Sequence, residues 1–248
     1  MIRFFTLLTM ILLLSGVGME GFAQTFTFNS SRPGCNGTWG DVDCWAISNS
    51  CGSGNSSAPP PTVKTSGCAV NIIIESDVTL PNNVAFGGAL FRSLTVNNAT
   101  LTFNGDVTIN ANSKVDFVTN SGEIVVNGAG GIIVSASSGN GTTEFNVKGD
   151  GLGNITTSKI DLNNDVNITI FHGGSLVTTG DTFFAGKGIT MTVDGFFRTK
   201  SLRITGQNNV LRTSDGQSGT VIIEGDVDLT GGGNPDVFAG ISMNGFSE

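Results

Sequence analysis

Short alternations of apolar and polar residues recur along the chain from Val70 onward, and they constrain the fold more than any other feature. They show the period-2 pattern of strands with one buried face, and Gly, Asn or Asp separates each from the next. Grouped in threes, they give turns that start near Ile72, Leu94, Val115, Phe145, Ile168, Ile189 and Val221, at steps of 22, 21, 30, 23, 21 and 32 residues. A unit this short cannot bury its own apolar face, so the near-constant period predicts a solenoid.

A sandwich of antiparallel hairpins is the structural alternative, because Asn104–Gly105, Asn127–Gly128 and Asn140–Gly141 are good two-residue hairpin turns. We favour a right-handed parallel β-helix, since these short links join strands of the same inward pattern and a sandwich would show longer crossovers. The two long steps then require extra loop, which we place at Ser135–Thr142 and Gly206–Gly219. Insertions in a solenoid project from one face, so we expect function there.

The composition agrees with an all-β chain and excludes two other classes. Gly accounts for 36 of 248 residues and charged residues for only 13%, so the chain has few good helix formers and a helical bundle is excluded. The net charge of −8 repels phosphate, which argues against a nucleic-acid partner. A hydrophobic fraction of 38% is sufficient for a packed core.

Residues 1–23 have the order of a secretory signal peptide. Arg3 precedes an apolar run from Phe4 to Val17, and Gly21-Phe22-Ala23 provides a small-x-small cleavage site. The alternative is a membrane anchor, but the apolar run is shorter than the ~20 residues that a spanning helix needs. We therefore expect a mature chain that starts at Gln24, has no membrane span, and is secreted or displayed on the cell surface.

The four cysteines fall within the segment between the signal peptide and the repeats. In an oxidising compartment, an even number of clustered cysteines predicts two disulfides, and the three possible pairings remain open. A zinc site made of all four cysteines is the alternative, but gaps of 8, 6 and 16 residues contain no knuckle spacing. The disulfide-forming residues are Cys35, Cys44, Cys51 and Cys68. We divide the chain into a signal peptide (1–23), a Cys- and Trp-containing cap (24–69) and parallel β-helix repeats (70–248).

The cap and first repeat contain a recognisable progression: Gly37–Trp45, then Pro59–Pro61, then Val70–Leu80. It resembles the start of bacterial secreted or surface proteins with a right-handed parallel β-helix, including adhesin-like proteins exported by the type IX route, and is loosely similar to an eight-glycine domain of animal ectodomains. The resemblance covers about residues 36 to 110 and implies an adhesin-like role. The chain ends at Glu248 in mid-pattern without a recognisable sorting domain, so we expect either a fragment or export without that signal.

Few residues are candidates for catalysis. The single histidine, His172, lies in a turn-like segment, and no G-x-S-x-G motif is present, so a catalytic triad is not predicted. Alternation with Val227 and Leu229 places an acidic trio on one outer face, where it could act on an acidic glycan or simply be solvated. The trio is Glu224, Asp226 and Asp228, and the cations about one turn earlier are Arg198, Lys200, Arg203 and Arg212.

Three further patterns have a structural and a functional interpretation. Asp150–Asn154 resembles a calcium loop but lacks the full ligand set, so we interpret it as a turn. Trp39 and Trp45 could stack on sugars, but beside two cysteines a packed cap is favoured. Thr-x-Thr pairs are found in ice-binding solenoids, although the varying steps argue against a regular ladder. These pairs are Thr25/Thr27, Thr100/Thr102 and Thr190/Thr192.

The sequence thus predicts a non-catalytic adhesion or scaffold module with no cofactor. The first alternative is a β-helical polysaccharide lyase or hydrolase, and the second is a glycan- or ice-binding module. The expected partner is an extracellular polysaccharide or another cell surface.

Overall fold

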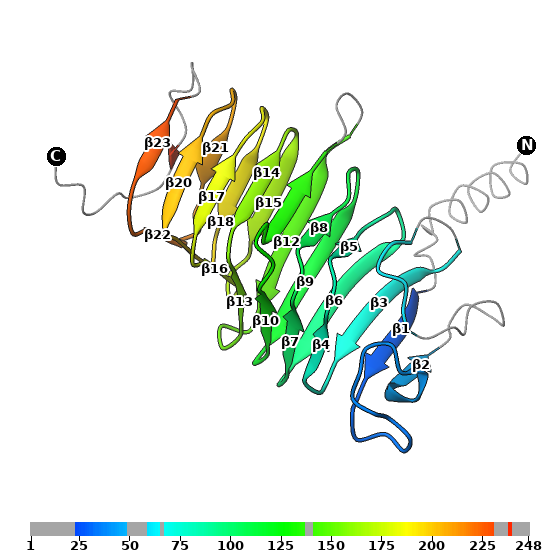
Figure 1. Ribbon diagram of the computed structural model, residues 1–248. Coiled ribbons are helices and arrows are strands. Elements are labelled where there is room, and N and C mark those ends of the chain that lie inside the picture. Colours follow the sequence, from blue (N-terminus) through cyan, green and yellow to red (C-terminus); the bar gives the residue numbers. More distant parts are fainter. Residues whose placement is uncertain (1–22, 49–58, 65–66, 137–140, 231–237, 240–248) are drawn as a thin grey trace, which may run out of the picture.

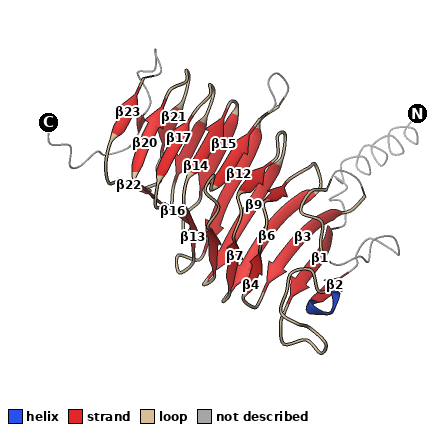
Figure 2. Ribbon diagram, in the orientation of Figure 1, coloured by secondary structure: helices blue, strands red, loops and turns tan. Residues whose placement is uncertain are grey.

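The computed structural model describes residues 23–48, 59–64, 67–136, 141–230 and 238–239. Their regular structure is strand, apart from one short 3-10 helix, η1 (Val42–Cys44), in the cap (Figure 2). The strands stack along one axis from the cap to the last turn (Figure 1). Within these ranges, no helix is long and apolar enough to cross a membrane.

Seven turns each contribute one strand to each of three sheets, and every strand pairs in parallel with its counterpart in the next turn. Sheet 1 contains β3 (Ala69–Ile74), β6 (Phe91–Asn97), β9 (Lys114–Asn120), β12 (Thr143–Gly149), β15 (Val166–Ile170), β18 (Thr190–Val193), β21 (Val210–Arg212) and β24 (Phe238–Ala239). Sheet 2 contains β4 (Val78–Leu80), β7 (Thr100–Phe103), β10 (Glu123–Val126), β13 (Asn154–Thr157), β16 (Ser175–Thr178), β19 (Phe196–Thr199) and β22 (Thr220–Ile223). Sheet 3 contains β5 (Val84–Phe86), β8 (Val107–Ile109), β11 (Ile132–Ser135), β14 (Ile160–Asn163), β17 (Asp181–Phe184), β20 (Ser201–Ile204) and β23 (Val227–Leu229). The prediction of a parallel β-helix is confirmed, and the Asn104–Gly105 link joins strands of different sheets rather than a hairpin.

The core consists of inward-facing columns of Val, Ile, Leu and Phe. One column of sheet 1 contains Ile72, Leu94, Phe117, Val147, Ile170 and Val193. A second contains Val115, Phe145, Ile168, Met191 and Leu211. The predicted turn starts are therefore out of register by two residues at two steps, because Leu94 pairs with Phe117 rather than Val115, and Ile168 pairs with Met191 rather than Ile189. A two-residue shift keeps the same face inward, so periodicity alone cannot detect it.

The seventh turn also begins earlier than predicted. Val221 lies in sheet 2, opposite Phe197, and the turn starts with β21 (Val210–Arg212) in sheet 1. Gly206–Gly219 is therefore not an insertion, since it contains that strand. The strand was missed because its apolar residues Val210 and Leu211 are adjacent and show no alternation. The other long segment joins β11 to β12, and residues 137–140 within it lie outside the described residues.

Asp and Asn side chains at the corners tie each turn to the next. The Asp106 Oδ1 atom accepts a hydrogen bond from the Gly130 amide at 2.8 Å, and the Asp106 amide donates to Asn83 Oδ1 at 2.9 Å. At Gly128, a Cβ atom would lie 2.2 Å from Asp106 Oδ1, so only glycine allows this approach. The corners therefore fix the stacking register as well as the chain direction.

The cap extends sheet 1 beyond the first turn. Strand β1 (Ala23–Phe28) pairs in parallel with β3, and β2 (Trp45–Ser48) adds antiparallel at its outer edge. The Trp45 indole N–H donates to the Trp39 carbonyl at 2.9 Å, and the two rings meet edge to face. Because Trp45 is buried and Trp39 packs against the core, these tryptophans fill the cap, as expected.

Cys35 and Cys44 form a disulfide that closes the cap loop. This bond excludes the zinc alternative at these two sulfurs, although Asp41 lies beside them. Cys68 is disulfide-bonded as well, whereas Cys51 lies outside the described residues. The second predicted pairing therefore stays a prediction.

The inward and outward assignments of β15 can be tested by two neighbouring substitutions. Ile168→Ala should lower the free energy of unfolding by about 2–5 kcal/mol, because it opens a cavity in the core. Thr169→Ala, on the outer face, should cost less than about 1 kcal/mol. Urea unfolding of both variants measures the difference, and a larger loss for Thr169→Ala would contradict the register.

The disulfides can be tested by thiol counting under denaturing, non-reducing conditions, which should find no free thiol. The Cys35→Ala/Cys44→Ala double variant should lower the free energy of unfolding by about 2–4 kcal/mol, because the open loop gains entropy in the unfolded chain. Two or more free thiols in the unmodified protein would contradict the prediction.

Candidate functional site

Among the described residues, strands or bridges cover the N-terminal end of the solenoid at two sheets and not at the third. Sheet 1 is extended by β1 and β2. Near sheet 3, the segment that follows Pro59–Pro61 pairs with the corner after β5, where the Lys64 amide donates to the Gly87 carbonyl at 2.9 Å. In sheet 2, the first strand β4 has only β7 as a described neighbour, so its outer edge faces the cap loop across a gap.

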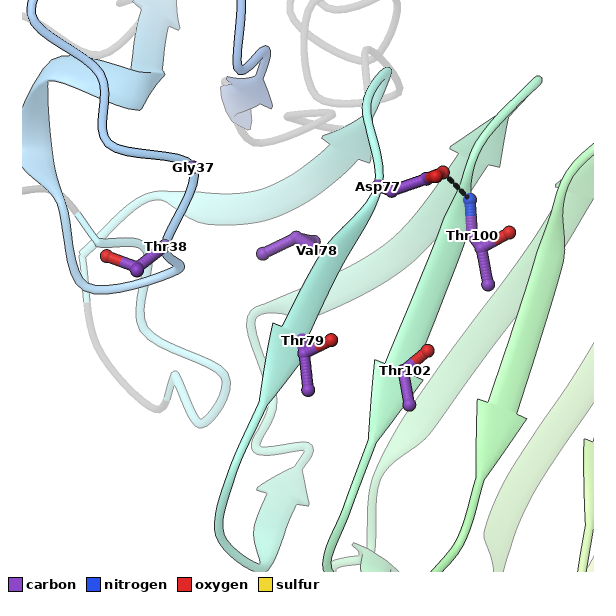
Figure 3. Close-up of a pocket in the computed structure, with 7 residues that line it drawn as sticks. All are labelled: Gly37, Thr38, Asp77, Val78, Thr79, Thr100 and Thr102. Carbon is purple, nitrogen blue, oxygen red and sulfur yellow. Dashed lines mark hydrogen bonds between the residues drawn. The ribbon is translucent and has the colours of Figure 1, made fainter.

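A cavity of about 440 Å³ occupies this gap (Figure 3). Thr79 and Thr102 lie side by side on β4 and β7, and the cap loop forms the opposite wall through Gly37 and Thr38. The Asp77 carboxylate accepts a hydrogen bond of 2.7 Å from the Thr100 amide, which fixes it at the corner before β4. The open edge is thus lined mainly by hydroxyl groups and one carboxylate.

A second cavity of about 320 Å³ adjoins the first, because Asp77 and Thr100 line both. It continues over the corners between sheets 1 and 2 toward β10 and β13. Its remaining lining residues are Asn98, Ala99, Ser121, Gly122, Glu123, Leu152, Gly153 and Asn154. We call the two cavities together the sheet 2 groove. Both volumes fall within the range of about 300–1,000 Å³ that is usual for ligand sites.

The groove carries negative charge only. Asp77 and Glu123 are its charged residues, and no Lys, Arg or His is among the residues that line it. The Asn154 amide donates to Glu123 Oε1 at 3.2 Å. Within the described part of the chain neither carboxylate forms an ion pair, so their charge is available to a ligand.

The Asp150 turn borders the groove and places Leu152 in solvent, with 81% of its surface exposed. Hydrogen bonds lower the pKa of Asp150 to about 2, above all from the Leu152 amide and then from the Ser121 hydroxyl. The Asp150 carboxylate therefore accepts hydrogen bonds from its own turn and from Ser121. This agrees with the interpretation of the segment as a turn.

The outer faces form continuous columns. In sheet 2 one column contains Thr79, Thr102, Val125, Thr156, Val177, Arg198 and Ile222. In sheet 1 one column is polar from β3 to β21, before Ala239 of β24 follows: Asn71, Ser93, Asp116, Asn146, Thr169, Thr192 and Arg212. The columns therefore continue although the number of residues per turn varies. The extra residues of the 30-residue step lie in the loop between β11 and β12, outside the strands. The Thr-x-Thr pairs are nevertheless divided between two sheets, so they do not form one threonine ladder.

The acidic trio does not converge. Glu224 pairs with Arg198 next to sheet 2, whereas Asp228 lies in sheet 3 and pairs with Arg203 at 3.2 Å. The prediction that the three carboxylates share one face was therefore wrong, because a corner of the solenoid separates Glu224 from Asp228. Of the other cations, Arg212 donates to Thr192 in sheet 1, and Lys200 lies between β19 and β20. His172 is exposed in the turn after β15, as expected.

The sequence did not indicate the groove. Its walls come from the cap loop and from strands roughly 40 residues later, and no motif links them. The only signal was the Thr100/Thr102 pair, which lies at its centre.

The described part of the chain is a parallel β-solenoid of about seven turns with a disulfide-tied cap. No family model matches it, and neither the curated proteins nor the solved structures include one that is significantly similar.

The Asp150 carboxyl should titrate with a pKa of about 2, below its ordinary value of 3.8. Because the folded-state pKa is lowered, its contribution to stability is present above pH 3.8 and is lost as the pH falls through about 2. Ser121→Ala should raise this pKa toward 3.8, whereas Thr95→Ala on sheet 1 should leave it unchanged. Carboxyl NMR measures both, and an unchanged value in Ser121→Ala would contradict the assignment.

Proposed function

We propose that this protein is a secreted or cell-surface module for adhesion or scaffolding, which acts without catalysis and contacts an extracellular polysaccharide or another cell surface. The observation that carries the proposal is the polar column of sheet 1, to which each of seven turns contributes one polar residue from Asn71 to Arg212. Asn146 and Thr192 within it are buried, and the other five are at least partly accessible. Repeated polar groups on a rigid face suit weak contacts that add through multivalency.

The outer column of sheet 1 is also held in place by its own hydrogen bonds. Ser93 donates to Asn71 at 3.0 Å, and Asn146 donates to Asp116 at 2.8 Å. Side chains that are fixed before binding lose less conformational entropy when a ligand arrives. This pre-organisation supports a role in binding.

Two observations favour binding over turnover. Glycan hydrolysis needs two convergent carboxyl groups, one of them with a raised pKa. Glu224 and Asp228 are instead separated by a corner and paired with arginines, and Asp150 has a lowered pKa, opposite to that of a general acid. The lyase or hydrolase alternative depends on these carboxylates. In the described structure they do not form a catalytic site for it.

Export rests on the sequence of residues 1–23 and on the resemblance of the cap to secreted surface proteins. Residues 1–22 lie outside the described residues, and Ala23 begins β1. Cleavage after Ala23 leaves the rest of that strand, from the buried Gln24, paired with β3. The proposed processing is thus compatible with an intact cap.

The test uses the protein recovered from the exported fraction, whose first residue should be Gln24 by N-terminal sequencing. It is incubated with neutral, amino-bearing and acidic polysaccharides, and both binding and new reducing ends or unsaturated products are measured. We expect binding without turnover. Product formation that disappears in Asp226→Asn or Asp228→Asn would overturn the proposal, as would failure to bind any polysaccharide or cell surface.

A further inference from the structure

We infer that the sheet 2 groove is the main ligand site of the proposed adhesion module, and that it binds a non-acidic polysaccharide chain. The inference rests on the proposed function and adds the place of binding and the chemical class of the ligand. It is carried by the shape of the groove, its hydrogen-bonding groups, its charge and one exposed apolar wall.

The shape of the groove suits an extended chain. It begins at the cap loop, crosses β4 and β7, and continues over the corners of the second and third turns to β10 and β13. Both cavities are open to solvent along the surface, whereas a closed pocket would accept only a small molecule. Neighbouring strands place their side chains ~4.8 Å apart, a spacing comparable to the length of one sugar ring.

The polar groups of the groove match sugar hydroxyls. Thr79, Thr100 and Thr102 offer hydroxyls that both donate and accept, and Asp77 and Glu123 offer acceptors for the hydroxyl pairs of a pyranose. Asp77 and Glu123 are each held by one hydrogen bond from the next turn, at 2.7 and 3.2 Å, so they are oriented before a ligand binds. Few side chains need to be ordered on binding.

The charge of the groove determines which polysaccharides fit. Two carboxylates without a cation among the described lining residues repel uronate and sulfate groups, and they accept neutral sugars or attract amino sugars. Because Asp77 is exposed, this repulsion should weaken as the salt concentration rises. The overall charge of −8 acts in the same direction.

An apolar wall completes the amphipathic surface that a sugar ring needs. Leu152 projects from the Asp150 turn at the far end of the groove with most of its surface in solvent. A hydrogen bond of 3.0 Å from the Gly151 amide to the Gly173 carbonyl ties this turn to the next corner. Because its turn is held in place, the exposed Leu152 side chain can cover the C–H face of a pyranose. The hydroxyls and carboxylates of the groove can then form hydrogen bonds with the edges of the sugar ring.

The experiment compares three soluble probes by isothermal titration calorimetry: a cello-oligosaccharide, a chitosan oligosaccharide and an alginate oligosaccharide. We expect the first two to bind and the third not to bind. Thr100→Val/Thr102→Val removes two hydroxyls without changing shape, and should weaken binding of the cello-oligosaccharide about tenfold. The matched control Thr95→Val/Thr108→Val changes two outward threonines, one on sheet 1 and one on sheet 3, that lie outside both the groove and the polar column of sheet 1, and should bind as the unmodified protein does.

Charge is tested separately. Asp77→Asn/Glu123→Gln keeps the acceptors for the Thr100 amide and Asn154, and should weaken chitosan binding and remove most of its salt dependence. Asp215→Asn is the control, because Asp215 is an exposed carboxylate outside the groove. Binding of alginate, or binding of the neutral chain that is unchanged in the threonine double variant, would overturn the inference. In the second case the proposed adhesion function would still stand, whereas loss of all polysaccharide and cell binding in the unmodified protein would refute both.

Discussion

The parallel pairing of each turn with the next is the interaction on which the rest of this structure depends. A single turn has three short strands with unpaired backbone groups and one apolar face, and only a stacked neighbour satisfies both. Phe86, Phe117 and Phe145 interlock edge to face along the axis, and corner residues such as Asp106 bond the backbone of the following turn. Once the packing of the core fixes the register of the strands, the outward side chains must lie in straight columns. The outer faces proposed to bind a ligand are therefore a consequence of the core.

The first turn has no preceding turn of the repeat to pair with its three strands, so other segments must cover their edges. Exposed strand edges promote aggregation and are usually covered or shortened. Sheet 1 is covered by β1 and β2, and the corner after β5 by residues 59–64, whereas β4 has three residues between Asp77 and Pro81. A short strand with a charge before it and a proline after it discourages edge pairing, so this edge can remain open beside the cap loop. The groove therefore lies at the one N-terminal sheet edge that no described strand covers.

The sequence predicted the fold well and the candidate site poorly, for physical reasons. Period-2 alternation reports which side chains face inward, so the solenoid, the packed tryptophans and most strands could be predicted. It does not report register, which is why Leu94 was paired with Val115 instead of Phe117, and it missed β21, whose Val210 and Leu211 are adjacent. The groove depends on how the cap loop lies against β4, which is tertiary packing between distant segments. Likewise, the trio was placed on one face because alternation cannot show the corner between β22 and β23.

The carboxylates of the groove differ from those that form ion pairs between neighbouring turns. Four ion pairs join neighbouring turns: Lys114–Glu144, Lys148–Asp116, Arg198–Glu224 and Arg203–Asp228. Such exposed pairs each contribute at most about 1 kcal/mol, so they favour the correct stacking register more than they stabilise the fold. Asp77 and Glu123 are held by an amide N–H and an asparagine amide instead, and they keep their net charge. A carboxylate that is oriented by neutral donors and has no cationic partner can serve an incoming hydroxyl or amine, and in the described structure two such groups meet in one groove.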